Sequence, residues 1–426
     1  MIKVLERWFE LCDRQSVKTK ITNPTRHNFS LLRQLCNLIP THLVSSLARE
    51  KGIERQARSF SPWSHVVSLI YVQLTHCFSL NDASDGLRLH SGELSTVRGA
   101  TAPSRNALSH ANRQRDAAMA EALFWKVLEH LQRLKPGFGQ GRGRPMRRFK
   151  RAIHAVDSST IKLVMSCFSW AHHRRRKAAA KLHLRLNLQS FLPACAIVDK
   201  AKGHDNQKAR ELCLGLKAGE IAIFDMAYVA YEHLHELTQR AVWWVSRAPE
   251  NTACRVVKKL QGKAKGKILR DDLIRLTGPK SKMLYPGLLR RVRAVVEVDG
   301  QEREMEFLTN NLQWSAQSIV DLYKCRWQIE VFFKQIKQTL QLADFVGHSA
   351  NAVKWQIWTA LLTYVLLRYM SFVSRWEQSF VRLWGLVRAG LWKRLDLLDL
   401  LQRWCGTARH RLKFRACPEQ AYFPGF

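Results

Sequence analysis

Paired cysteines are missing from this sequence of 426 residues. Its ten cysteines stand singly, with no Cys-x-x-Cys pair. We expect no secretory leader at its N-terminus. A disulfide framework and a zinc ribbon both need closely spaced cysteines, so we expect neither. We therefore expect a reduced, cytoplasmic protein that builds a stable core through its size alone.

A long uninterrupted apolar run is also missing. The most apolar stretch extends from Trp355 to Val373, and it is interrupted by Gln356, Arg368 and Tyr369. A membrane-spanning helix needs about 20 mainly apolar residues. We expect a buried helix here and no membrane anchor.

Acidic residues are scarce relative to basic ones. Asp and Glu number 34 against 69 Lys and Arg, which gives a formal net charge of +35 and a pI near 10.3. A field of this sign favours polyanions, and repeated phosphate contacts explain it better than a small neutral substrate. A hydrophobic content of 46% with 10% aromatics excludes a mainly disordered chain. Charge and length together favour nucleic-acid binding over the alternatives, a ribosome-associated or a membrane-surface protein.

The N-terminal part is expected to be helical. Apolar residues recur three and four positions apart from Asn28 to about Leu134. The basic residues interleaved among them include Arg98, Arg105, Arg113 and Arg115. Residues 1–134 are therefore interpreted as a helical DNA-binding domain, and a helical adaptor with a solvated basic face is the alternative. A Gly-, Pro- and Arg-rich stretch, residues 135–150, follows as a basic linker.

Strand-like runs dominate after the linker. They occupy residues 152–156, 182–188, 194–198 and 221–224, and a helix is expected at 231–240. We assign residues 151–240 to the first part of an α/β core. Residues 241–309 are strand-rich with Lys/Gly turns, which indicates a mostly β insertion. Residues 310–376 are expected to complete the core, and residues 377–426 to form a C-terminal helical region.

The segment from Asp321 to Leu342 contains neither Gly nor Pro and is expected to form one helix. At about 100° per residue, one stripe of that helix carries Tyr323, Arg326, Glu330 and Lys337, with Lys334 at its edge. A carboxylate among such donors suits a site that holds a metal ion and phosphate oxygens together. The alternative is an ordinary exposed helix with an Arg326/Glu330 ion pair.

Two aspartates follow strand-like runs. Asp157 comes directly after residues 152–156, and Asp225 after residues 221–224. The C-terminal ends of strands in open α/β sheets carry metal and substrate ligands. Each aspartate alone could instead be a helix cap or a turn residue. Together with Glu330 they fit two-metal phosphoryl transfer, in which oxygen ligands hold two Mg²⁺ ions about 4 Å apart.

The polar stripe has the spacing Tyr-x2-Arg-x3-Glu-x6-Lys. This spacing resembles the signature of the bacterial insertion-sequence transposases of family four, which have a ribonuclease-H-like catalytic core. The segments VDSSTIKL, KLHLRLNL, GHDN and FDMAY also look like motifs of that family. The resemblance covers about residues 30–370, and one departure is Ala227, where many relatives carry glycine.

The resemblance implies a catalytic triad formed by Asp157, Asp225 and Glu330. These residues would bind two Mg²⁺ ions, for which Mn²⁺ should substitute. It also implies a ribonuclease-H-like core with a β insertion between the second Asp and the Glu, and a homodimer that pairs two DNA ends.

Phosphate contacts are implied for other residues of the stripe. The resemblance assigns Tyr323, Arg326 and Lys337 to the phosphates of the element end. Lys334 lies at the edge of the same stripe and is a further candidate.

Other candidates for DNA contact lie outside the stripe. In relatives an insertion tryptophan holds a flipped base, so Trp243 or Trp244 could stack a base, with core packing as the alternative. Lys181 and His183 have strand spacing, so they would share one face and could approach DNA near the active site. A histidine satisfied within the core is the alternative for His183.

These features predict a DNA transposase that nicks each terminal inverted repeat. The freed 3′-hydroxyl would then attack the opposite strand, forming a hairpin, or target DNA. The expected partners are double-stranded DNA and a second copy of the chain, in a bacterial cytoplasm and at the nucleoid when bound. Two alternatives remain, a catalytically silent DNA-binding protein derived from a transposase and a structure-selective nuclease on the same fold.

Overall fold

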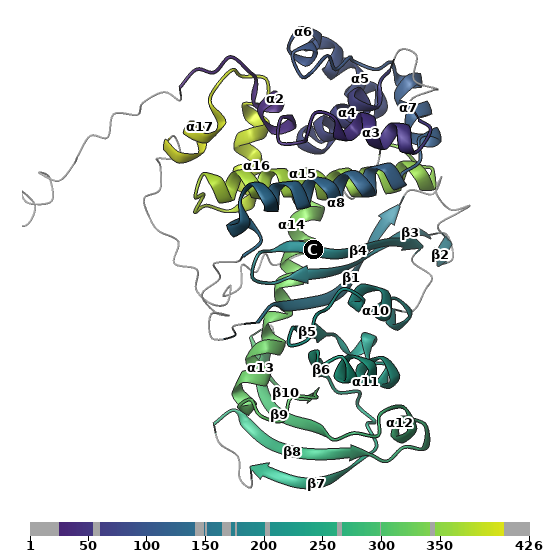
Figure 1. Cartoon of the computed structure of the whole chain (residues 1–426), viewed down its shortest axis with the longest axis vertical. Coiled ribbons are helices and arrows are strands. Elements are labelled where there is room, and N and C mark those ends of the chain that lie inside the picture. Colours follow the sequence, from purple (N-terminus) through teal and green to yellow (C-terminus); the bar gives the residue numbers. More distant parts are fainter. Residues whose placement is uncertain are drawn as a thin grey trace, which may run out of the picture.

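Figure 1 shows a computed structural model in which a helical end lies above a long twisted sheet. It describes residues 25–53, 60–140, 149, 151–163, 172–174, 177–200, 205–261, 266–298, 300–340 and 346–403. Most of the expected basic linker and the last part of the C-terminal region lie outside these residues.

One mixed sheet holds every strand of the described chain, in the order β2-β3-β1-β5-β6-β10-β9-β8-β7 with β4 beside β3. The strands are β1 (Ile153–Leu163), β2 (His172–Arg174), β3 (Lys177–Asn187), β4 (Leu192–Lys200), β5 (Ile221–Phe224), β6 (Trp243–Arg247), β7 (Cys254–Gln261), β8 (Ile268–Leu276), β9 (Leu289–Val298) and β10 (Gln301–Thr309). β1, β5 and β6 run parallel to one another, and all other neighbours are antiparallel. With helices on both faces, the expected α/β class is confirmed.

The helices form the helical end and cover the sheet. They are α2 (Leu31–Cys36), α3 (Leu43–Glu50), α4 (Pro62–Thr75), α5 (Leu80–Leu89), α6 (Ser91–Ser95), α7 (Arg105–Gln114), α8 (Ala118–Leu134), α10 (Asp205–Cys213), α11 (Tyr231–Gln239), α12 (Pro279–Leu284), α13 (Ala316–Cys325), α14 (Trp327–Thr339), α15 (Ala350–Val373), α16 (Phe380–Ala389) and α17 (Leu397–Arg403). The stretch expected to be a buried helix is α15, which packs against α4, α7 and α8. No helix in the described part of the chain is long and apolar enough to cross a membrane.

The two faces of the sheet are covered by different helices. β5 is a continuous apolar run whose four side chains are all buried, as expected of a parallel strand covered on both sides. On β1 the side chains alternate, so Ile153 and Ala155 join the core that includes α14 and α15. Val156 instead joins a second core formed with α10 and α11. A residue's position along β1 therefore decides which helices it meets.

The strands expected between residues 241 and 309 are present as β6 to β10, but they extend the same sheet. β6 follows α11 and pairs in parallel with β5, with Ile221 opposite Trp243. β10 then pairs antiparallel with β6. Because a helix separates β5 from β6, the chain can return to the same edge and add a parallel strand. β6 thus continues the parallel part of the sheet, and β7 to β10 lie beyond it.

Candidate active site

The parallel pairing of β1 with β5 brings two aspartates to the same level of the sheet. The last pair in register joins Val156 to Phe224, and the next residue on each strand is an aspartate, Asp157 and Asp225. Neighbouring strands lie about 4.8 Å apart, so the two aspartates are adjacent. β5 ends here because the Asp225 carbonyl accepts a hydrogen bond from the Tyr228 N–H (3.0 Å) in the turn that follows.

Asp157 does not end its own strand, and this part of the sequence prediction was wrong. β1 continues to Leu163 because β3 pairs with it along this whole length, with Asp157 opposite Leu184. Only the pairing with β5 stops at Val156. The two aspartates therefore lie at the C-terminal end of the parallel ladder rather than at the end of the sheet.

The segment expected to be one helix forms two helices that meet at Arg326. The Arg326 N–H bonds to the Tyr323 carbonyl (2.9 Å) and the Ile329 N–H to the Arg326 carbonyl (3.0 Å). This three-residue spacing is that of a tighter turn than the α-helix. The polar stripe crosses the junction, and its Tyr323 and Arg326 side chains reach the aspartates.

Tyr323 and Arg326 join three carboxylates into one cluster. The Arg326 guanidinium donates to Asp157 Oδ2 (2.9 Å) and to Glu330 Oε1 (2.7 Å). The Tyr323 hydroxyl donates to Asp225 Oδ1 (3.3 Å). The side chains of Arg326 and Asp157 are only 14% and 17% exposed, so water screens their ion pair weakly. The structure thus brings together the three acids and two of the donors predicted from the sequence.

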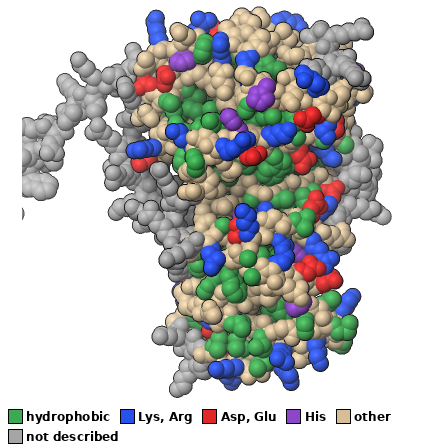
Figure 2. Space-filling view, in the orientation of Figure 1, with side chains coloured by type: hydrophobic (Ala, Val, Ile, Leu, Met, Phe, Trp, Pro, Cys, Tyr) green, Lys and Arg blue, Asp and Glu red, His purple; other side chains and the backbone are tan. Residues whose placement is uncertain are grey.

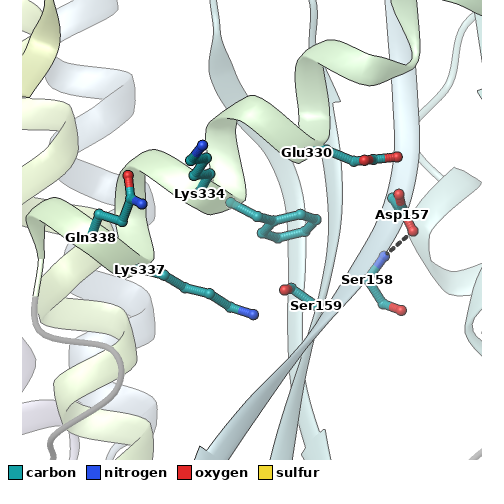
Figure 3. Close-up of a pocket in the computed structure, with 8 residues that line it drawn as sticks. Asp157, Ser158, Ser159, Glu330, Lys334, Lys337 and Gln338 are labelled. Carbon is teal, nitrogen blue, oxygen red and sulfur yellow. Dashed lines mark hydrogen bonds between the residues drawn. The ribbon is translucent and has the colours of Figure 1, made fainter. Parts of the chain in front are cut away.

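A cavity of about 470 Å³ opens beside the carboxylates, as Figure 3 shows. It is lined by Asp157, Ser158, Ser159, Glu330, Phe333, Lys334, Lys337 and Gln338. Glu330 and Asp157 lie close to each other at one end, while Lys337 extends along the other and donates from Nζ to the Thr160 carbonyl (2.8 Å). The sequence prediction missed Ser158, Ser159, Phe333 and Gln338, and adjacency to Asp157 was the available signal for the two serines.

Burial changes the electrostatics of the cluster. It raises the pKa of Asp157 from 3.8 to about 6. The Arg326 guanidinium and the Ser158 N–H, 2.7 Å from Oδ1, oppose this rise, whereas Asp225 and Glu330 add to it. A carboxyl group that titrates close to neutral pH beside two further acids is typical of a functional site.

The sequence of this chain matches a known family over the region that builds the cluster. A family profile described as "Transposase DDE domain" matches residues 148–366, just over half of the chain. The chain belongs to the DDE transposase family. A second profile, described as a domain of unknown function (DUF4372), matches residues 27–97 of this transposase.

Individual relatives agree with the family match. The transposase is 29% identical over 325 residues to "Putative transposase y4zB" of Sinorhizobium fredii, covering 75% of this chain and 86% of that protein. It is 26% identical over 206 residues to "Transposase InsG for insertion sequence element IS4" of Escherichia coli, covering 44% and 43%. Among solved structures, the piggyBac transposase synaptic complex with hairpin DNA aligns with 91% of this chain and 85% of that chain, with a TM-score of 0.42 and 10% identity. The family profile and the sequence relatives confirm the expected resemblance to insertion-sequence transposases.

DDE transposases generally use divalent metal ions, and carboxylate oxygens are suitable ligands for them. Within the described residues, no three acidic, histidine or cysteine side chains are placed to hold a metal ion in their present positions. The Arg326 guanidinium bridges Asp157 and Glu330 instead. The three carboxylates supply oxygen ligands of the type that a divalent ion prefers, and Arg326 now occupies two of them.

The two tryptophans predicted to stack a base occupy a central strand. Trp244 has no exposed surface and donates from its ring N–H to the Thr238 hydroxyl (3.1 Å). Its burial supports the alternative of core packing for Trp244. Trp243 is partly buried and lies against Trp314. α11 packs against β6, and the sequence pattern alone did not show which of the two tryptophans this helix buries.

Lys181 and His183 share a face, as predicted, but it is not the face of the active site. β3 places His183 opposite Ser158 and Lys181 opposite Thr160, one residue out of phase with Asp157. Side chains alternate along a strand, so both lie on the face opposite to the Asp157 carboxylate. His183 is also 2% exposed, which supports the alternative of a core histidine.

Lowering the pH below about 6 should weaken the binding of divalent ions to this transposase. The Asp157 carboxyl is ionised above its pKa of about 6 and protonated below it. A protonated ligand must lose its proton before it binds a cation, so affinity should fall about tenfold per pH unit below this pKa. Folding raises the pKa of Asp157, so ionisation of its carboxyl group opposes folding. The contribution of Asp157 to the free energy of unfolding therefore falls as the pH rises through about 6.

Electron paramagnetic resonance of Mn²⁺ binding at about pH 7 and about pH 5 would measure this dependence. Thermal unfolding curves at both pH values would serve as the control that the protein stays folded. Equal affinities at the two pH values would contradict the prediction.

Proposed function

We propose that this transposase nicks each terminal inverted repeat of its element and joins the freed 3′-hydroxyl to the opposite strand or to target DNA. Asp157, Asp225 and Glu330 are the proposed catalytic and metal-binding residues. Their convergence from β1, β5 and α14 is the observation that supports this most strongly. Two Mg²⁺ ions, or Mn²⁺ in their place, would activate the attacking oxygen and stabilise the leaving one when bound.

The sheet order supports a ribonuclease-H-like core. Antiparallel β1, β3 and β4 are followed by parallel β5 and β6, with helices on both faces. We assign residues 151–240 and 310–376 to this catalytic core and add β6 to it. The β insertion proposed for residues 241–309 then begins after Arg247. Residues 1–134 remain the proposed DNA-binding domain, and residues 377–426 the C-terminal helical region.

The donors around the cavity are proposed to contact phosphates. Lys334 and Lys337 are exposed along α14, and Tyr323 and Arg326 lie deeper beside the acids. Phosphate oxygens accept the same hydrogen bonds that Arg326 now gives to carboxylates and Lys337 gives to a carbonyl. A bound DNA strand could therefore take over these donors and release Asp157 and Glu330 for the metal ions.

On the face that Figure 2 shows, the charged side chains do not mark a single path for DNA. Figure 2 shows Lys and Arg side chains over both the helical end and the sheet, rather than in one patch. Net charge of this size promotes binding to any duplex, so it supports affinity rather than selectivity. We propose a homodimer that holds two ends, because both ends of an element must be cut together.

Cleavage of an end-bearing duplex is the test of this function. The purified protein is incubated with a duplex that spans the junction between element end and flanking DNA, with Mg²⁺, with Mn²⁺ and with chelator. Defined cuts at the junction are expected with either ion and none with chelator. A scrambled duplex of equal length is the control, and equal cutting of both would favour the structure-selective nuclease. Binding without cutting in either ion would instead favour the silent DNA-binding protein.

A further inference from the structure

Helix α7 presents a polar face that the proposed catalytic site does not use. Its buried side consists of Leu108, Ala111 and Asn112. Its exposed side chains are Arg105, Asn106, His110, Arg113 and Gln114. At about 100° per residue these five occupy one half of the helix. Figure 1 shows α7 at the edge of the helical end, and its buried side packs against α5 and α15.

This face differs in chemistry from those of neighbouring surface helices. α5 exposes Asp82 and Asp85 beside Arg88, and α8 pairs Arg133 with Glu129. Such mixed charges are typical of a solvated surface. The exposed face of α7 has no carboxylate at all.

The side chains of this face also lack strong partners within the protein. Among the described residues, none of the five forms an ion pair, and their one hydrogen bond joins Arg105 to Asn106 within the face at 3.4 Å. Arg, Asn and Gln are the side chains that pair in two-point fashion with guanine and adenine edges. The face therefore has the composition of a base-reading surface.

The other side of α7 is fixed firmly to the protein. Asn351 donates to the carbonyls of Asn112 (2.9 Å) and Arg115 (2.6 Å), and the Trp355 ring N–H donates to the Arg115 carbonyl (2.7 Å). The Asn112 side chain shares a buried hydrogen bond with His65 of α4 (2.9 Å). These contacts join α7 to α15 and α4. They all involve the buried side or the C-terminal end of α7, and none involves its polar face.

We propose that α7 is the recognition helix of this transposase, which enters the major groove and reads base pairs of the terminal inverted repeat. This inference rests on the proposed function and adds the residues that distinguish the element's own ends from other DNA. The major groove admits one α-helix and displays a distinct donor and acceptor pattern for every base pair. Arg105 and Arg113 lie two turns apart, about 12 Å along the axis, so both can reach bases of one site.

The attachment of α7 also sets where the recognised sequence lies relative to the cut. α15 packs against α14, which carries Glu330. A hydrogen bond of 2.8 Å between the His76 ring and the Thr339 carbonyl further joins the end of α4 to the end of α14. A recognition helix mounted on this frame would hold the bases it reads at a fixed distance from the scissile phosphate.

The test compares binding to an end-bearing duplex and to a scrambled duplex of equal length, by fluorescence anisotropy without divalent ions. Arg113→Lys separates the two kinds of contact, because lysine keeps the charge but cannot make the two-point contact with guanine. We expect Arg113→Lys to bind the scrambled duplex like the wild type and to lose roughly tenfold to a hundredfold on the end-bearing duplex. Arg105→Ala and Arg113→Ala should also lose the preference for the end-bearing over the scrambled duplex.

Arg133→Ala on α8 is the matched control, and it should keep the wild-type preference for the end-bearing duplex. Circular dichroism melts show whether each variant is folded. The inference is overturned if Arg113→Lys keeps the full preference for the end-bearing duplex. It is also overturned if Arg113→Ala weakens binding to both duplexes equally, because Arg113 would then contact phosphates only. A wild type without any preference would instead overturn the proposed function, and the inference with it.

Discussion

Glutamine in place of Glu330 should slow strand cleavage severely and leave binding to the element end close to that of the wild type. The change keeps the size of the side chain and removes the negative charge that, with Asp157 and Asp225, would hold the divalent ions. Loss of one ligand should slow cleavage roughly a thousandfold or more, equivalent to about 4 kcal/mol of transition-state stabilisation. Single-turnover cleavage and fluorescence anisotropy measure the two quantities separately.

Asp321→Asn is the matched control for this experiment. Asp321 lies on the neighbouring helix α13, and its carboxylate accepts a hydrogen bond from Gln317 (2.8 Å). The variant loses the same charge on the same pair of helices, and it should cut at close to the wild-type rate. If Glu330→Gln cuts as fast as Asp321→Asn, Glu330 is not a metal ligand, and the assignment of the triad fails.

Alanine in place of Asp271 should destabilise the protein by about 3–5 kcal/mol. The Arg290 guanidinium donates to both Asp271 oxygens (2.8 and 2.7 Å), and the two side chains are 5% and 8% exposed. Arg290 also donates to the Trp314 carbonyl, just before α13. Without Asp271 the buried Arg290 guanidinium would lose its carboxylate partner. Arg290 lies where β8 and β9 contact the segment that leads into α13.

Urea unfolding curves of the variant and the wild type would measure the loss of stability. Glu302→Ala is the control, because the exposed pair of Glu302 with Lys267 (3.0 Å) should contribute at most about 1 kcal/mol. The double variant Asp271→Leu/Arg290→Met should recover much of the lost stability, because it leaves no unpaired buried charge. Equal unfolding midpoints for Asp271→Ala and Glu302→Ala would contradict the prediction.

Local patterns predicted much of the fold. The run Ile221–Phe224 was predicted as a strand with the bounds that the structure shows, because four consecutive apolar residues suit a strand covered on both faces. The helix expected at 231–240 is α11 (Tyr231–Gln239), and the strands expected between 241 and 309 are present. The predicted bounds of an element were wrong where residues distant in sequence decide where that element ends. β1 passes Asp157 only because β3 pairs with it beyond that residue.

Basic residues show the same limit. Arg98 and Arg115 were grouped with Arg105 and Arg113 as possible DNA contacts. Arg98 instead donates to the carbonyls of Cys36 (2.7 Å) and Ile39 (3.2 Å), and Arg115 to the Ser61 carbonyl (3.1 Å). Of these four arginines, Arg105 and Arg113 are exposed. Spacing along a helix distinguishes its two sides, but it does not reveal which side other elements cover.

The sequence by itself determined the family of this protein and the residue types of its candidate site, because the spacing of the motif residues is a local property of the chain. Tertiary structure alone decided that Asp157 and Asp225 lie side by side, that Arg326 bridges Asp157 and Glu330, and that Trp244 is core. Strand register and burial depend on residues far apart in the chain, and no local pattern encodes those partners.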